Sequence, residues 1–220
     1  MTELPADPTL DEIRAYLAPL LPAQAAFDGW TPAAVSLAAA QAGVDQDLAL
    51  LAFKDGAVAM IDAWFKSVDH RMAAKLPVER LAGMKIRERI TVLIWARIEI
   101  LAPDREALRR ALSILAMPQN AFRAARMGWR ATDLMWRLAG DTAADFNHYT
   151  KRVTLGAVYA ATVLALLDDE TADLSGTRAF LDRRIENVMQ FERVKADLKG
   201  RAEHRPSLSR LIGRLRYPAI

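Results

Sequence analysis

The chain has 220 residues, of which 26% are charged and 52% hydrophobic, and it contains no Cys. The lack of Cys excludes disulfides, Cys-ligated zinc, iron–sulfur clusters and thiol catalysis. The formal net charge is +3, yet residues 193–220 alone carry eight basic and two acidic side chains, so the rest of the chain sums to −3. A basic tail on a mildly acidic body indicates an anionic partner, either lipid headgroups or nucleic acid.

The beginning of the chain bears on location. Residues 1–12 hold four acidic side chains and no basic one. Secretory signals begin with basic residues, and mitochondrial transit segments are rich in Arg and poor in acidic residues. We therefore expect a protein of the bacterial cytoplasm, with its basic tail on the inner face of the cytoplasmic membrane. The uncharged run over 153–167 is too short to cross a membrane as a helix and predicts a buried helix.

Apolar residues recur with helical spacing along the whole chain, which predicts an all-α fold of about ten helices. Pro, Gly and capping residues delimit these helices. The first half is expected to form helices over 9–24, 31–42, 45–53, 55–76 and 78–101. The second half is expected to form helices over 104–116, 119–139, 142–167, 177–198 and 207–216.

The first three predicted helices resemble the helix-turn-helix head of TetR-type repressors, with turns at Phe27–Thr31 and around Gly43. A DNA-binding head needs Lys and Arg to neutralise phosphates. No Lys or Arg occurs over residues 15–53, and the predicted recognition helix carries Asp45 and Asp47 near its tip. We therefore expect a packing unit that does not bind DNA.

Catalytic, metal and cofactor motifs are not found in the sequence. Asp145 and His148 have a spacing that can chelate a metal on a helix, but a di-iron bundle needs Glu-x-x-His pairs, and the chain has none. The ten Gly are scattered and form no phosphate-binding loop. The acidic run 168–170 is interpreted as a solvated loop. We expect neither an enzyme nor a bound cofactor or metal.

The last predicted helix is amphipathic. Its apolar residues recur at i, i+3, i+4 and i+7, and Arg lies on the opposite side, which is typical of helices that lie on a membrane surface. The alternative is a helix docked on the body by its apolar side. The candidate membrane-binding residues are Leu208, Arg210, Leu211, Ile212, Arg214 and Leu215.

Two segments carry a family resemblance. Residues 139–152 read AGDTAADFNHYTKR and residues 180–189 read FLDRRIENVM. Both resemble the lipid-binding accessory proteins of coenzyme Q (ubiquinone) biosynthesis, which have a TetR-like fold. The resemblance implies a non-enzymatic homodimer that takes isoprenoid quinone precursors from the membrane and presents them to a demethoxyubiquinone hydroxylase. It further implies that the hydroxylase binds the motif surface, for which the candidates are Trp136, Asp145, Asn147, His148, Tyr149 and Arg152.

The middle helices offer candidates for an apolar lipid site. Met and aromatic residues at helical spacing are also typical of a plain core, and both interpretations stand. The candidates are Trp95, Ile98, Leu112, Leu115, Met127, Met135, Tyr159 and Val163.

Three parts are expected: a degenerate head with its connecting helix over 1–76, a lipid-binding and dimerisation body over 77–199, and a membrane-binding tail over 200–220. Two other functions remain open at this point. One is a ligand-responsive transcriptional regulator, and the other is a membrane-tethered scaffold without a ligand.

Overall fold

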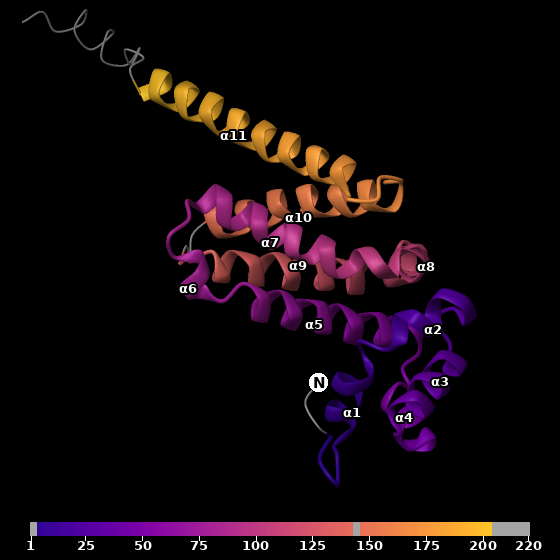
Figure 1. Cartoon of the computed structure of the whole chain (residues 1–220). Helices are drawn as coiled ribbons and strands as arrows, with labels where there is room; N and C mark the ends of the chain where they lie inside the picture. The colour runs from indigo at the N-terminus through magenta and orange to yellow at the C-terminus, as the bar shows by residue number, and fades with distance from the viewer. Residues whose placement is uncertain (1–3, 143–145, 204–220) are drawn as a thin grey trace, which may run out of the picture. The chain divides into compact units, whose positions relative to one another are not determined.

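The structure, a computed structural model, describes residues 4–142 and 146–203 (Figure 1). These residues form helices and turns without a strand, as the apolar spacing predicts. The contacts divide the chain into two units, residues 1–181 and 182–220. The first unit holds α1 to α10 and the start of α11, and the described part of the second is the remainder of α11.

Short helices build the N-terminal head. Thr9 and Glu12 form the predicted capping box at the start of the first one. The expected single helix over 9–24 is wrong, because a turn separates two helices there. Pro22 has no N–H for the carbonyl of Ala18, and its ring crowds that carbonyl. The head helices are α1 (Leu10–Leu17), α2 (Leu21–Asp28), α3 (Pro32–Ala42) and α4 (Gln46–Ala52).

The ends of α3 and α4 follow the sequence signals. Pro32 is the first residue of α3, and Gly43 ends that helix in the left-handed conformation at φ 68°. The side chain of Asp45 accepts a hydrogen bond of 2.9 Å from the backbone N–H of Leu48 at the start of α4. Leu48 and Leu51 are exposed on α4, so this helix presents apolar and acidic side chains to solvent.

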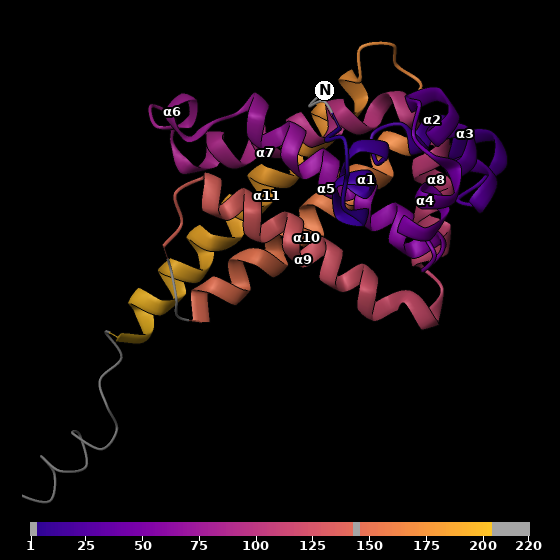
Figure 2. The same ribbon diagram turned by 90° about the horizontal axis from the view of Figure 1, so that it is seen from below.

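The longer helices pack into a bundle. Figure 1 shows α5, α9, α7 and α10 lying side by side, and Figure 2 shows α9 next to α10 from below. The expected single helix over 78–101 is interrupted by a turn at Gly83. The bundle helices are α5 (Ala57–Lys75), α7 (Ile86–Leu101), α8 (Arg105–Leu115), α9 (Ala121–Leu138) and α10 (Phe146–Leu167). The short α6 (Val78–Leu81) precedes α7, and α11 (Ser175–Glu203) spans the boundary between the two units.

Trp30 joins the head to the bundle. Its indole Nε1–H donates to the carbonyl oxygen of Ala107 in α8 at 3.1 Å, and its ring centroid lies 5.3 Å from that of the fully buried Trp64 in α5. Tilted aromatic pairs at this separation stabilise a core beyond the area they bury. These contacts fix the head to α5 and α8.

The predicted membrane helix lies outside the described residues. This applies to all of its candidate residues, namely Leu208, Arg210, Leu211, Ile212, Arg214 and Leu215. The proposed boundaries at 76 and 199 stay predictions.

Candidate ligand cavity and neighbouring surface

A cavity of about 410 Å³ lies among the bundle helices. It falls within the size range of small-molecule sites, and its lining is almost wholly apolar. Helices α8, α9 and α10 supply most of the lining, while α5 and α7 supply one side chain each. The lining residues are Phe65, Arg97, Leu108, Leu112, Leu115, Ala116, Ala124, Met127, Gly128, Ala131, Gly156, Tyr159, Ala160, Val163 and Leu164.

Small residues explain why the helices leave space here. On α9 the cavity is lined by Ala124, Gly128 and Ala131, which are spaced i, i+4 and i+7. On α10 it is lined by Gly156 and Ala160, again four residues apart. Residues at these spacings share one side of a helix. Two stripes without bulky side chains therefore border the cavity, where larger side chains would fill it.

One charged side chain meets the cavity. Arg97 of α7 is 1% exposed, and it forms a buried ion pair with Asp69 of α5. Its guanidinium carbon lies 5.0 Å from the ring centroid of Tyr159. Burial alone lowers the pKa of Arg97, but Tyr159 and Asp69 offset it, so the pKa lies above its ordinary value and the group is charged. The sequence signal, one Arg in the apolar run 92–98, was available but was not singled out.

The structure brings five of the eight predicted lipid-binding residues together at this cavity: Leu112, Leu115, Met127, Tyr159 and Val163. The other three lie elsewhere. Ile98 and Met135 are fully buried in the core, and Trp95 packs under the guanidinium of Arg178 at 5.2 Å. That these residues bind a lipid stays a prediction.

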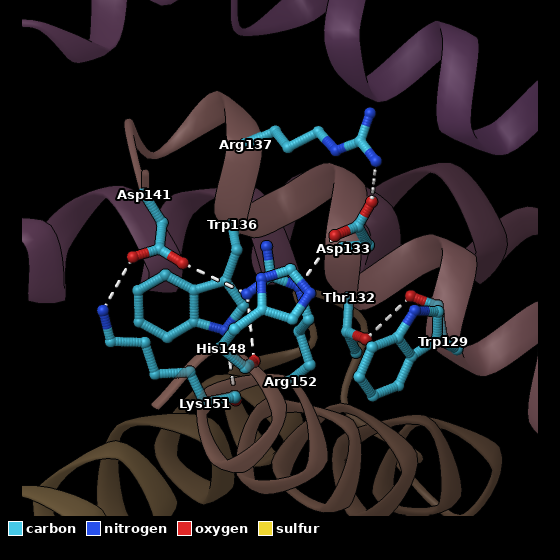
Figure 3. A network of polar contacts seen from close by, with 9 residues as sticks. All are labelled: Trp129, Thr132, Asp133, Trp136, Arg137, Asp141, His148, Lys151 and Arg152. Atoms are coloured by element: carbon cyan, nitrogen blue, oxygen red, sulfur yellow. Dashed lines mark hydrogen bonds and ion pairs between the residues drawn. The ribbon is translucent and has the colours of Figure 1, made fainter. Parts of the chain in front are cut away.

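A network of ion pairs connects α9 to α10 (Figure 3). Arg152 of α10 is its centre: Nε lies 2.7 Å from a carboxylate oxygen of Asp133, and Nη1 lies 3.1 Å from one of Asp141. Asp141 also pairs with Lys151 at 2.7 Å, and Asp133 with Arg137 at 2.6 Å. Each of the two carboxylates thus pairs with two cationic side chains. Such pairing offsets the cost of burying the charge of Arg152.

The charge state of Asp133 follows from this network. Burial alone raises the pKa of Asp133, but hydrogen bonds and charge from Arg152 and Arg137 outweigh it, so the pKa lies below the ordinary value. The carboxylate is therefore ionised at neutral pH. The network is a structural clamp whose charged members are already paired with one another.

Three aromatic rings form a surface cluster beside the clamp. Trp129 of α9 lies 6.1 Å from His148 and 5.9 Å from Tyr149 of α10, centroid to centroid, and the latter two rings are 5.2 Å apart. Tyr149 is 59% exposed and Trp129 37%. Exposed aromatic groups of this kind are typical of interaction surfaces. We call Trp129, His148 and Tyr149 the aromatic cluster.

The predicted partner-binding residues have different surroundings. Tyr149 and His148 belong to the aromatic cluster, whereas Arg152 is 2% exposed and paired with carboxylates. Trp136 is half-buried, and its indole N–H donates to the carbonyl of Lys151 at 3.1 Å (Figure 3). Asp145 and the side chain of Asn147 lie outside the described structure. Tyr149 is therefore exposed to solvent, whereas Arg152 is buried between α9 and α10, and that these residues bind a partner stays a prediction.

The exposed side of α10 is apolar. Residues 148–167 are long and apolar enough to cross a membrane by length and composition, with a mean hydropathy of 1.3, but a helix that packs in a soluble bundle passes the same test. Here α10 packs on α7, α8 and α9. Its solvent side carries Val153, Ala157, Ala160 and Leu164, which we call the α10 stripe.

Comparison with known proteins confirms the resemblance. The COQ9 family model matches residues 121–192. The "Ubiquinone biosynthesis protein COQ9, mitochondrial" of Rattus norvegicus is 29% identical over 181 residues, which are 80% of this chain and 58% of that protein. The protein of the same name from Homo sapiens is 29% identical over 80% of this chain and 57% of its own length. This chain thus spans somewhat more than half the length of these relatives.

The fold is that of TetR regulators. The crystal structure of the TetR transcriptional regulator from Nitrosomonas europaea superposes with a TM-score of 0.63 and covers 79% of this chain and 96% of its own. The sequence identity is 24%, so the likeness shows the fold alone. The all-α, TetR-like architecture expected from the sequence is confirmed.

The expected location is corrected by the same comparison. The relatives from Rattus norvegicus, Homo sapiens, Bos taurus, Dictyostelium discoideum and Drosophila melanogaster are eukaryotic, and their names place them in mitochondria. The expectation of a bacterial cytoplasmic protein is therefore wrong. It depended on the charge of the first residues, which is a weak guide.

Proposed function

We propose that this chain, which resembles COQ9 over most of its length, acts in ubiquinone biosynthesis as a non-catalytic lipid-binding protein. It takes an isoprenoid quinone precursor from the membrane surface, holds it in the cavity and presents it to a demethoxyubiquinone hydroxylase. The observation that carries the proposal is the cavity of about 410 Å³ with apolar walls from α8, α9 and α10. Such walls suit an isoprenoid chain, which has no polar group to satisfy.

The surface for the hydroxylase is proposed at the aromatic cluster. Tyr149 and Trp129 are exposed aromatic residues, and the clamp around Arg152 holds the two helices that carry them. Trp129 directly follows Gly128, which lines the cavity. A partner bound at the cluster would therefore lie along the same helices that enclose the ligand.

Two further partners belong to the proposal. The basic tail over 200–220 binds the membrane surface, as its charge and its apolar spacing support. A second copy of the chain pairs through the α10 stripe, because an exposed row of apolar side chains on one helix loses its contact with water in a dimer. Light scattering tests the pairing, and Val153→Glu should yield monomers.

The test of the function uses a pair of substitutions on one helix. Ala160 and Ala157 are both exposed Ala residues of α10, but only Ala160 lines the cavity. Ala160→Trp obstructs the cavity, whereas Ala157→Trp adds the same side chain beside it. In cells that depend on this chain for ubiquinone, we expect Ala160→Trp to lower ubiquinone and raise its demethoxy precursor. Ala157→Trp should change the ratio of the two much less. Both positions belong to the α10 stripe, so light scattering on both variants checks that they affect pairing alike.

Equal quinone levels with and without the chain would refute the role in ubiquinone biosynthesis. Equal effects of the two Trp substitutions would show that the role in ubiquinone biosynthesis does not depend on the cavity. Normal quinone levels in a folded Tyr149→Ala variant would remove the aromatic cluster from the hydroxylase surface.

A further inference from the structure

We propose that Arg97 is the polar anchor of the cavity and binds a neutral oxygen acceptor on the head group of an amphipathic ligand, such as a quinone carbonyl. The apolar remainder of the ligand then extends toward the surface between α9 and α10. This inference rests on the proposed lipid-binding function and adds the orientation of the ligand to it.

The first observation is an unsatisfied donor. Within the described structure, Nε of Arg97 is shielded from solvent and has no hydrogen-bond partner, although Nη1 of the same side chain pairs with Asp69. A buried donor without a partner destabilises the protein, and it does so more strongly when the group is charged. Such a group needs an explanation, and a ligand acceptor supplies one.

The second observation is that Arg97 belongs to the cavity lining. Apart from Tyr159, all the other lining side chains are apolar. A ligand with one polar end therefore has one place to put that end. Convergent polar groups in an otherwise apolar site fix a ligand's orientation.

The third observation is the gradient of exposure along the cavity wall. Arg97 and Leu108 are almost completely buried, at 1% each. Gly128, Ala160 and Leu164, which also line the cavity, are exposed. The head group thus enters first, and the tail leads outward past residues of α9 and α10.

The charges around Arg97 favour a neutral head over an anion. Asp69 takes one hydrogen bond from Arg97 and another, at 3.2 Å, from Nε of Arg130. Arg130 is in turn paired with Asp62 at 2.6 Å. The guanidinium charge of Arg97 is therefore already compensated, and an anion placed beside it would meet the carboxylate of Asp69.

The test compares two probes that differ only in the head: 2-hexyl-1,4-benzoquinone and hexylbenzene. Their affinities for the full chain are measured by isothermal titration, and the absence of Cys removes the usual site of quinone addition. An apolar cavity alone would favour hexylbenzene, because the quinone oxygens lose water on binding. With the anchor, we expect the quinone to bind more tightly, and Arg97→Met to reduce its affinity at least about tenfold relative to hexylbenzene.

Arg130→Met is the matched control, because Arg130 is the other Arg that binds Asp69 but does not line the cavity. It should leave the preference for the quinone unchanged. Should Arg97→Met not fold, Arg97→Lys keeps a positive partner for Asp69 but lacks Nε, and its preference should fall in the same direction. Hexylbenzene binding reports whether the cavity of each variant is intact.

Loss of both probes' affinity to the same extent in Arg97→Met would show a structural role for Arg97 and overturn the anchor. An unchanged preference would overturn it too. Binding of hexylbenzene without preference for the quinone in the native chain would refute the anchor alone. Failure of both probes to bind the native chain would refute the lipid-binding function on which the anchor depends.

Discussion

Two carboxylates, Asp133 and Asp141, hold the buried guanidinium of Arg152 between α9 and α10. Removal of one partner from a buried ion pair leaves an uncompensated charge and costs about 3–5 kcal/mol. We therefore expect Arg152→Met to lower the free energy of unfolding by roughly that amount, measured by chemical denaturation followed by circular dichroism. Tyr149→Ala, three residues away on the surface, is the control and should cost about 0.5 kcal/mol or less. Equal small effects of both would mean that the clamp does not stabilise the helix pair.

Asp169 ties the start of α11 to the end of α10. Its carboxylate accepts hydrogen bonds from the backbone and the hydroxyl of both Thr171 and Thr177, at 2.5–2.9 Å. These bonds hold the pKa of Asp169 far below its ordinary value. The hydroxyl of Thr171 lowers that pKa most, followed by the hydroxyl of Thr177. The expected solvated loop over 168–170 is therefore wrong at this residue, which is buried and caps the helix.

The low pKa of Asp169 makes a pH-dependent prediction. A depressed folded pKa adds stability that is complete above the unfolded value of about 3.9 and is lost as the pH falls below it. The native melting temperature should thus drop between about pH 5 and pH 2. Asp169→Asn should melt lower at pH 7 and lose less on acidification, while Asp168→Asn, at an exposed neighbour, should follow the native curve. Identical pH profiles for native chain and Asp169→Asn would contradict the capping role.

Arg89 and Gly140 join α7 to the end of α9. Nη1 of Arg89 donates to the carbonyl of Ala139 at 2.8 Å, and Gly140 adopts φ 87°. A Cβ at position 140 would lie 3.1 Å from that same Nη1. Gly140→Ala therefore combines backbone strain with a displaced hydrogen bond and should destabilise the fold by more than about 1 kcal/mol.

Gly128, inside α9, supplies the contrast. A Cβ there would meet nothing within 4 Å. Since Ala is favoured over Gly inside a helix, Gly128→Ala should raise stability by about 0.5–1 kcal/mol. Thermal melts of the two variants should move in opposite directions. A neutral Gly140→Ala would show that the junction tolerates a side chain.

Helix boundaries were predictable where the sequence carries helix-capping and helix-breaking residues. Pro32, Gly43 and Asp45 act locally, so the ends of α3 and α4 agree with the sequence. Apolar spacing continues through the turns inside 9–24 and 78–101 and does not predict them. The first turn depends on the ring of Pro22, and in the second Arg89 donates hydrogen bonds to the carbonyls of Ala82 and Met84. Local sequence signals therefore predict where a helix lies better than whether a turn interrupts it.

The candidate site was predictable in part. Apolar residues of α8, α9 and α10 were expected to gather, and Leu112, Met127 and Val163 do. Ile98 and Met135 have the same residue types and spacing but lie in the packed core. The small residues of α9 and α10 oppose each other, and this arrangement decides which side of each helix faces the cavity. The pairing of the two helices cannot be predicted from a single sequence. The burial of Arg152 likewise depends on two carboxylates from another helix and the loop after it.

In the whole molecule, the head and the bundle have the fold of a TetR regulator, and the bundle contains an apolar cavity. The head carries no Lys or Arg over residues 15–53, and the expectation that it does not bind DNA stays a prediction. The bundle keeps an apolar cavity and carries an exposed aromatic cluster. The central claim is therefore that the cavity holds an isoprenoid quinone precursor.

Mass spectrometry of the lipids that co-purify with the full chain tests this claim most directly. The native chain and Ala157→Trp should both retain an isoprenoid quinone or quinone precursor in a stable ratio to protein. Ala160→Trp, which obstructs the cavity, should retain much less of it while melting at a similar temperature. An empty native chain, or equal amounts of the same lipid on Ala160→Trp and Ala157→Trp, would contradict the account.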